Sequence, residues 1–432
     1  MKQNILKLMA VFLVVLFALS IFPAGIAAAE WDGTTKATSY ESGDGTEANP
    51  FIIKNGPQLA YLAEQANADA KNTEGKFFKL AADINLGGKE WTPIGTGDNR
   101  FEGNFDGNNH TVSNFVITSS TTSDKRLGLF GVTRMAEIKN LKIDHVTITT
   151  PTDGYAGALA GYLTGGTVSN CHAYENVAIN GTTGSIGGIA GRLANGIAEY
   201  CTSAATVSGN GAKNVFAGGI IGCAGVSATV RFCVNTGPVT STRTEGEAKT
   251  LYTGGIVGLT GAGSEPASII NCYNIGSITG IAATGGITGR IHVDGAVVEN
   301  CYNLGSISGE DNYSGGIVGW INKTATFANC FAKEQGSLPL FGNNDASVDV
   351  TGLVAKTESE IKALTDAIDA AIDELNKTPA EETTATTTAS STTSSDSSTS
   401  PTTFDQAYIL ILLASISIIV CFMFKKSSKK AV

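Results

Sequence analysis

The sequence predicts an all-β protein, a right-handed parallel β-helix in which repeats of about 30 residues form successive coils. One observation is a glycine-containing cluster that recurs seven times. The clusters begin at Leu127, Gly157, Gly187, Gly218, Gly254, Gly285 and Gly315. A second observation is that each repeat holds about three short apolar segments, separated by glycine or asparagine and without a helical pattern between them. Sandwiches and propellers need strand–turn–strand pairs at shorter spacing, so the β-helix is favoured over both.

The first segment, residues 1–29, predicts a secretion signal. Lys2 and Lys7 form a basic start, residues 8–22 are continuously apolar, and the alanines at 27–29 offer a small-residue cleavage site. An uncleaved membrane anchor at the amino terminus is the alternative.

The folded region follows, and its first part differs from the repeats. Residues 30–74 predict an extended lead-in and a short helix at 57–70, with Asn55 as its cap, that covers the open end of the stack. Residues 75–126 are interpreted as the first coils in a variant form.

Residues 127–333 form the regular repeats, and the third position of each cluster is always aliphatic. These residues are Leu129, Leu159, Ile189, Ile220, Ile256, Ile287 and Ile317. We expect them to point into the stack as its buried spine. The interval of 36 residues between the clusters at Gly218 and Gly254 indicates an insertion at 241–250, either a binding loop or a tolerated surface loop.

One cysteine recurs per repeat, 29 to 39 residues apart. The column comprises Cys171, Cys201, Cys233, Cys272, Cys301 and Cys330. Coils lie about 4.8 Å apart, whereas the Cβ atoms of a disulfide lie about 3.5–4.5 Å apart. A ladder of buried thiols is therefore favoured over disulfides. A linear column does not converge on a metal, so no metal site is expected. Cys223 falls outside this column.

Two further columns carry polar or aromatic residues. Asn235, Asn274 and Asn303 follow their cysteines by two positions and predict a structural ladder of stacked amides. The sixth cluster position lies an odd number of residues from the buried third, so we expect it to be exposed. This column reads Val132, Tyr162, Arg192, Cys223, Leu259, Arg290 and Trp320. Tyr162, Arg192, Arg290 and Trp320 are the candidate ligand-binding residues, by stacking and planar hydrogen bonding; unrelated surface residues are the alternative.

The pattern ends after Cys330, and three different segments follow. Residues 334–376 predict a capping region with an amphipathic helix at 357–375. Residues 377–403 are mostly Thr, Ser, Ala and Glu and predict a flexible stalk. Residues 404–432 predict a transmembrane anchor, because 407–424 is an uncharged apolar run and the lysines after it favour the cytoplasmic side.

The repeat resembles that of the GLUG family, named for a Gly-Leu-hydrophobic-Gly core. Gly128-Leu129-Phe130-Gly131 carries that core, residues 101–112 are similar to the segment that commonly precedes it, and the resemblance covers about residues 49–333. It implies a bacterial surface or secreted protein that is adhesin-like. Some members carry a zinc metallopeptidase that cleaves immunoglobulin A. That enzyme needs His-Glu-x-x-His, which this sequence lacks.

The end of the stalk resembles a cell-wall sorting signal of the Leu-Pro-x-Thr-Gly type. Pro401 and Thr403 match that signal, while Ser400 stands for Leu and Phe404 for Gly. The resemblance implies a sortase as a partner. Simple membrane retention by the carboxyl-terminal helix is the alternative, because a bulky residue replaces the glycine after the cleaved bond.

Charge and side-chain chemistry narrow the function. The formal net charge of −10 argues against nucleic acid as a partner. No cofactor is expected, and no recurring pair of carboxylates predicts glycoside hydrolysis. We therefore expect a non-enzymatic surface protein that recognises an extracellular glycan or protein. The alternatives are a spacer that binds nothing and a polysaccharide-active enzyme.

Overall fold

The computed structural model describes residues 30–118, 124–150, 153–211, 214–243, 250–309, 313–344 and 353–376. The predicted signal segment at 1–29, the stalk at 377–403 and the anchor at 404–432, with Pro401 and Thr403, lie outside these residues, as does most of the insertion at 241–250. Across the described ranges, every helix is too short or too polar to span a membrane.

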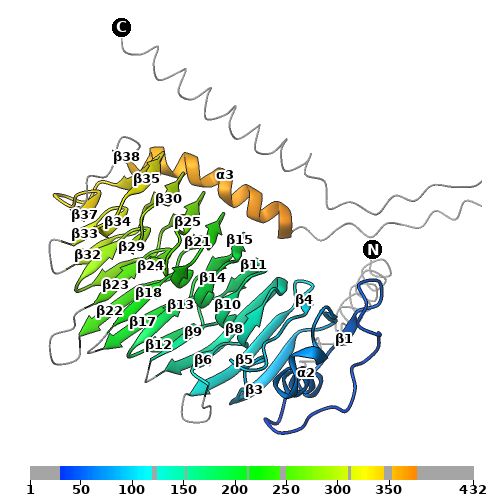
Figure 1. Ribbon diagram of the computed structural model, residues 1–432. Coiled ribbons are helices and arrows are strands. Elements are labelled where there is room, and N and C mark those ends of the chain that lie inside the picture. The colour runs from blue at the N-terminus through cyan, green and yellow to red at the C-terminus, as the bar shows by residue number, and fades with distance from the viewer. Residues whose placement is uncertain are drawn as a thin grey trace, which may run out of the picture. The chain divides into compact units, whose positions relative to one another are not determined.

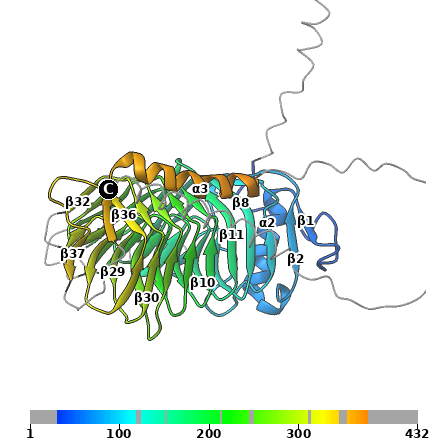
Figure 2. The ribbon, with the colours of Figure 1, turned by 90° about the horizontal axis from the view of Figure 1, so that it is seen from above.

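The predicted parallel β-helix is confirmed, because equivalent strands of successive coils pair in parallel (Figures 1 and 2). Two sheets take at most one strand from each coil. Sheet B contains β7 (Phe130–Arg134), β10 (Ala160–Thr164), β14 (Ala190–Ala194), β19 (Ile221–Gly225), β24 (Val257–Ala262), β29 (Thr288–Ile291), β34 (Val318–Ile321) and β37 (Phe341–Asn344). Sheet C contains β6 (Arg126–Leu127), β9 (Gly154–Gly157), β13 (Gly184–Gly187), β18 (Val215–Gly218), β23 (Leu251–Gly254), β28 (Ala283–Gly285) and β33 (Ser314–Gly315).

The remaining 23 strands form sheet A, which contains three ladders. The first ladder runs through β1 (Phe51–Ile53), β2 (Phe77–Leu80), β4 (Asn104–Asp106), β8 (Glu137–Thr150), β11 (Thr167–Ala173), β15 (Ile197–Glu199), β20 (Thr229–Arg231), β25 (Ser268–Ile270), β30 (Ala296–Glu299) and β35 (Ala325–Ala328). The second continues from β8 and β11 through β16 (Thr202–Ser203), β21 (Val234–Asn235), β26 (Tyr273–Asn274), β31 (Tyr302–Asn303), β36 (Cys330–Lys333) and β38 (Leu353–Lys356). The third runs through β3 (Ile84–Glu90), β5 (Thr111–Thr118), β8, β12 (Val177–Gly181), β17 (Thr206–Gly211), β22 (Val239–Arg243), β27 (Ile278–Gly280) and β32 (Ile307–Gly309).

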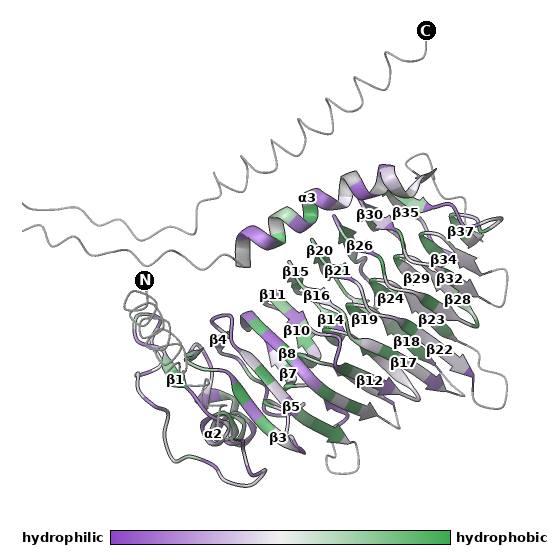
Figure 3. Cartoon of the chain, turned by 180° about the vertical axis from the view of Figure 1, so that it is seen from behind, coloured by the Kyte–Doolittle hydropathy of each residue, from purple (hydrophilic) through white to green (hydrophobic). Residues whose placement is uncertain are grey.

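Alternation along the strands separates the interior of the stack from its surface, and Figure 3 shows the resulting bands of hydrophobic and hydrophilic residues. The aliphatic third positions, from Leu129 to Ile317, are all buried in one hydrophobic cluster that runs through the coils. The prediction of a buried spine is confirmed. Each coil buries its apolar face against its neighbours, which is how solenoids obtain a core.

Helices are few. α2 (Gly56–Ala68) begins after Asn55, whose side chain accepts a hydrogen bond from the backbone N–H of Gln58 at 3.0 Å. Leu59 and Leu62 of α2 are buried in the main cluster, and the helix lies at the amino-terminal end of the stack (Figure 1). The short 3-10 helix η1 (Ala70–Asn72) follows. Near the carboxyl end, α3 (Glu358–Asn376) forms where the amphipathic pattern predicts a helix.

Candidate functional site

The six column cysteines lie at equivalent positions of successive coils in sheet A, within a strand or directly before one, and are fully buried. In the described residues their thiols are free. Each thiol donates to the carbonyl two residues earlier, as Cys171 does to Ser169 at 3.3 Å and Cys301 does to Glu299 at 3.2 Å. Burial raises the pKa of Cys171 and Cys233 well above the usual thiol value. These thiols therefore face the core, away from any ligand in solution.

The asparagine column is also buried. The Asn235 amide donates to the Asn274 side-chain oxygen at 2.7 Å, and Asn274 donates to Asn303 at 2.8 Å. Glycine provides the room: a Cβ at Gly219 would lie 2.2 Å from the Asn235 side chain, and one at Gly255 would lie 2.5 Å from that of Asn274. The two columns fit each other, which explains why the second cluster position is glycine in these coils.

A second amide ladder was missed in the sequence. The residue before each column cysteine, and before Leu141 in the first copy, adopts a left-handed backbone with φ between 50° and 55°, which asparagine tolerates better than most residues. Asn300 donates to Asn271 at 2.9 Å and Asn329 donates to Asn300 at 3.1 Å. Tyr200 and Phe232 interrupt this ladder and stack on each other with ring centroids 4.9 Å apart.

The sixth cluster positions pair in register along sheet B. Tyr162 is opposite Arg192, Arg192 is opposite Cys223, and Arg290 is opposite Trp320. The prediction that the whole column is exposed is wrong: Cys223 is 2% exposed and Arg290 is 8% exposed, while Tyr162, Arg192 and Trp320 are partly buried. Burial raises the pKa of Cys223 to about 11, so it is not a reactive surface thiol.

The cause is a second row of side chains on the adjacent strands of sheet C. This row consists of Arg126, Tyr155, Ser185, Phe216, Tyr252 and Ala283 in register, followed by Tyr313 directly before β33. The two rows contact each other across the turn that joins the strands within a coil. Tyr155 meets Tyr162 edge-on with ring centroids 5.6 Å apart, and Tyr313 meets Trp320 at 5.3 Å. We call the surface between the rows the outer groove.

Two arginines occupy equivalent places in the outer groove, three coils apart. Arg192 lies in the coil where sheet C supplies the small Ser185, and its Nη1 donates to the Tyr155 hydroxyl of the preceding coil at 2.9 Å. Arg290 lies in the coil of Ala283, and its Nη1 donates to the Tyr252 hydroxyl of the preceding coil. The Nε atoms of both arginines are buried without a hydrogen-bond partner.

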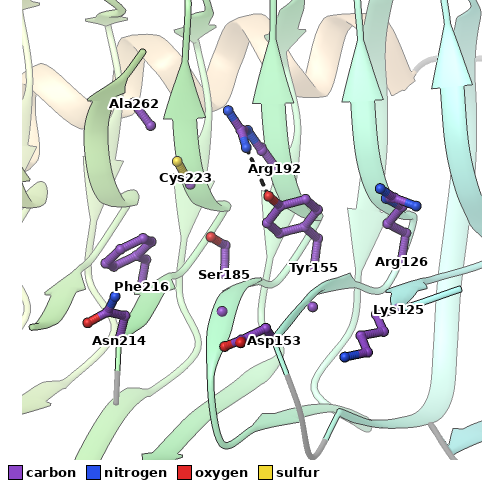
Figure 4. A pocket seen from close by; sticks show the side chains of 12 residues that line it. Lys125, Arg126, Asp153, Tyr155, Ser185, Arg192, Asn214, Phe216, Cys223 and Ala262 are labelled. Atoms are coloured by element: carbon purple, nitrogen blue, oxygen red, sulfur yellow. Dashed lines mark hydrogen bonds between the residues drawn. The ribbon is translucent and has the colours of Figure 1, made fainter. Parts of the chain in front are cut away.

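The Arg192 end of the groove is open. A pocket of about 430 Å³ lies there, and Figure 4 shows Ser185 between Tyr155 and Phe216 with Arg192 above the tyrosine. The other side chains that line it include Lys125, Arg126, Asp153, Asn214 and Cys223. Because Ser185 and Cys223 are small, they leave the space that larger residues fill elsewhere in the groove.

The Arg290 end is filled. Tyr252, Leu259, Ala283 and Cys223 form a second buried cluster, separate from the main core, and Trp320 packs against it. The Trp320 ring covers the Arg290 guanidinium, whose central carbon lies 3.7 Å from the ring centroid. Of the four candidate ligand-binding residues, only Arg192 lines the open pocket. Tyr162 contacts Arg192, with 5.3 Å between its ring centroid and the guanidinium carbon.

In the described part of the chain, no group of three or more His, Cys, Asp or Glu side chains is arranged to hold a metal ion. His172, for example, is buried and is within hydrogen-bond distance of Thr202 at 2.8 Å and of Asn170 at 3.0 Å. Of the described residues that line the open pocket, Asp153 alone is acidic.

Comparison with known proteins gives partial matches. No family model matches the chain. A stretch of 156 residues is 33% identical to the "Putative Gly-rich membrane protein" of Evansella cellulosilytica and covers 34% of this chain and 16% of that protein. Another of 159 residues is 28% identical to "Halomucin" of Haloquadratum walsbyi and covers 33% of this chain and 2% of that protein. The chain therefore spans less than a fifth of the length of either relative.

One solved structure is similar over most of the chain. It is a crystal structure from Bacteroides ovatus, titled as that of a "putative immunoglobulin A1 protease", with a TM-score of 0.51 and 24% identity. The match covers 76% of this chain and 90% of that one. At this identity the likeness concerns the fold alone and transfers no catalytic residue.

Proposed function

We propose that this chain is a cell-surface recognition module that binds an extracellular glycan in the outer groove. The observation that carries the proposal is the open pocket of about 430 Å³ at Arg192, beside the rings of Tyr155 and Phe216. This volume lies within the range of about 300–1,000 Å³ common for ligand sites. Aromatic faces stack on sugar rings, and a guanidinium offers planar hydrogen bonds to their oxygens.

The predicted cellular setting supports an extracellular ligand. The sequence predicts an export signal at 1–29 and an anchor at 404–432, and its repeats resemble those of adhesin-like GLUG proteins. The two relatives are named "Putative Gly-rich membrane protein" and "Halomucin". A stalk at 377–403 would hold the β-helix away from the membrane, whether or not a sortase acts at Thr403.

A glycan array probed with the full-length chain, purified in a mild detergent, tests the proposal. We expect binding to at least one class of glycan and its loss in Tyr155→Ala. The matched control is Tyr174→Ala, which removes a tyrosine that is 41% exposed and lies outside the pocket lining. Binding that survives Tyr155→Ala would place the site elsewhere.

Other outcomes favour the competing functions. The absence of binding to any glycan would favour a spacer, and binding only to a parallel peptide array would replace the glycan by a protein ligand. Turnover of a polysaccharide by the same preparation would make the chain an enzyme.

A further inference from the structure

We infer that the open pocket selects glycans that carry a carboxylate, such as a uronic or sialic acid, and that Arg192 binds this carboxylate. The inference rests on the proposed function, because it specifies the chemistry of the same site. It comes from the charge of the pocket, from the way Arg192 is held, and from the gap beside Ser185.

Charge comes first. Lys125, Arg126 and Arg192 line the pocket together with one acidic residue, Asp153, whereas the chain as a whole carries a net charge of −10. Arg126 is paired with Asp124 at 3.0 Å. Lys125 and Arg192 form no ion pair with any carboxylate in the described residues. The pocket is thus a local excess of positive charge on an acidic protein, which favours an anionic ligand.

The guanidinium of Arg192 is held in place before any ligand arrives. Its central carbon lies 5.4 Å from the centroid of the Tyr155 ring and 5.3 Å from that of Tyr162. One hydrogen bond, to the Tyr155 hydroxyl, uses a single N–H of Nη1. Nε is buried without a partner, so the donors that remain for a ligand are those of the two Nη atoms. A guanidinium has five N–H donors, and its planar edge matches a carboxylate with two parallel hydrogen bonds. Because the side chain is already ordered, binding loses little conformational entropy.

The space beside Arg192 fits a sugar ring. Tyr155, Ser185 and Phe216 are register partners on three successive strands, so Tyr155 and Phe216 lie two coils apart, or about 9.6 Å at the usual strand spacing. The small Ser185 lies between the two rings (Figure 4) and is 2% exposed, so it forms the floor of the gap between them. A pyranose in this gap has an aromatic ring on each side and can direct its carboxylate toward Arg192.

The test uses the full-length chain in detergent and an array of uronate and sialate oligosaccharides, each beside its carboxyl-reduced counterpart, together with sulfated glycans. We expect at least 10-fold tighter binding to a carboxylate form than to its reduced partner. Arg192→Met should weaken binding of the acidic form by about 10- to 100-fold, which is typical of one charge-assisted contact, and should abolish the preference. Arg290→Met is the matched control and should keep the preference.

The outcomes separate the inference from the proposed function. Equal binding of acidic and reduced forms, or binding of sulfated glycans alone, would overturn the inference and leave glycan recognition in place. No glycan binding at all would overturn both. If Arg192→Met does not fold, the unmodified protein still decides. Carboxylate binding requires the affinity for the acidic form, relative to that for its reduced partner, to fall as the pH drops below about 3, where sugar carboxylates gain a proton. A relative affinity that stays constant across that range contradicts it.

Discussion

Arg192 and Arg290 occupy the same position of the repeat at two ends of the outer groove, but the side chains around them differ. Arg192 donates to Tyr155 of the coil before, as Arg290 donates to Tyr252. In both cases sheet C supplies a small residue in the arginine's own coil. The repeat has therefore produced the same arginine–tyrosine contact twice.

The difference lies in the next coil. Cys223 follows Arg192 in the sheet B column, whereas Trp320 follows Arg290 and covers its guanidinium. A small residue leaves a pocket, and a large one closes it. In a solenoid, one outward position in one coil can thus decide whether a shared contact is part of a binding site or part of the packing, while the buried spine stays the same.

The largest expected effect comes from closing the open end. Cys223→Trp places a ring where Trp320 lies in the other end, and it should fill the pocket beside Arg192. We expect glycan affinity to fall by at least about 100-fold, or about 2.8 kcal/mol. Because Cys223 is 2% exposed, the larger ring should also cost about 1–3 kcal/mol of stability, so binding is measured below the melting temperature of the variant. Cys223→Ala is the control, because it keeps the pocket open and should bind normally. Full binding by the tryptophan variant would show that the ligand uses another surface.

The converse change should open the filled end. Trp320→Cys removes a ring that contacts Tyr313 and Arg290. Because large-to-small changes of aromatic residues in well-packed sites cost about 3–5 kcal/mol and Trp320 is only partly buried, we expect a loss of about 2–3 kcal/mol in the free energy of unfolding, measured with denaturant. Trp320→Phe should lose less. An unchanged stability would mean that this end is not packed as described.

Replacing Arg290 should mainly reduce stability, whereas replacing Arg192 should mainly reduce glycan binding. Arg290 is 8% exposed and its hydrogen bond lies under Trp320, so Arg290→Met leaves the Tyr252 hydroxyl without that donor. We expect it to reduce the free energy of unfolding by about 1–2 kcal/mol. Arg192→Met, at the open end, should reduce it by less than about 1 kcal/mol. Stability is measured by thermal and denaturant unfolding. If the two variants lose the same amount of stability, this assignment of roles is contradicted.

The smallest effect is expected from the tyrosine hydroxyls. Tyr155→Phe and Tyr252→Phe each remove one acceptor and keep the ring. Tyr252→Phe should cost about 1 kcal/mol of stability, because the Arg290 N–H is buried there. Tyr155→Phe should cost less, since water reaches Arg192, and should weaken glycan binding a few-fold by freeing the guanidinium. Calorimetric unfolding and binding titrations of both variants measure this, and a larger stability loss in Tyr155→Phe would reverse the comparison.

The repeat alone predicts much of this architecture. A fixed offset from the glycine cluster gives the buried spine and the register column of Tyr162, Arg192, Arg290 and Trp320, because parallel coils stack equivalent residues. The left-handed asparagine ladder could also have been predicted from the sequence. Asparagine precedes the column cysteine, or Leu141 in its place, in five of the seven copies. Tyr200 and Phe232 obscured that pattern.

Burial of the column could not be predicted in the same way. Whether an outward residue is exposed depends on the side chain that faces it from sheet C, and that row changes from Ser185 to Phe216 to Ala283 without a period. It depends also on how sharply the chain turns between the two strands of a coil. A pattern of alternation gives only the direction of each side chain, so it treated Arg192 and Arg290 as equal.

Hydrogen–deuterium exchange of the full-length chain, with and without the best glycan from the array, tests the central claim most directly. Saturating ligand should protect the backbone amides of β9, β13, β14 and β18, which surround the Arg192 pocket, and leave β28, β29 and β34 around Arg290 unchanged. Protection centred on the Arg290 strands, or equal protection at both ends, would contradict the account.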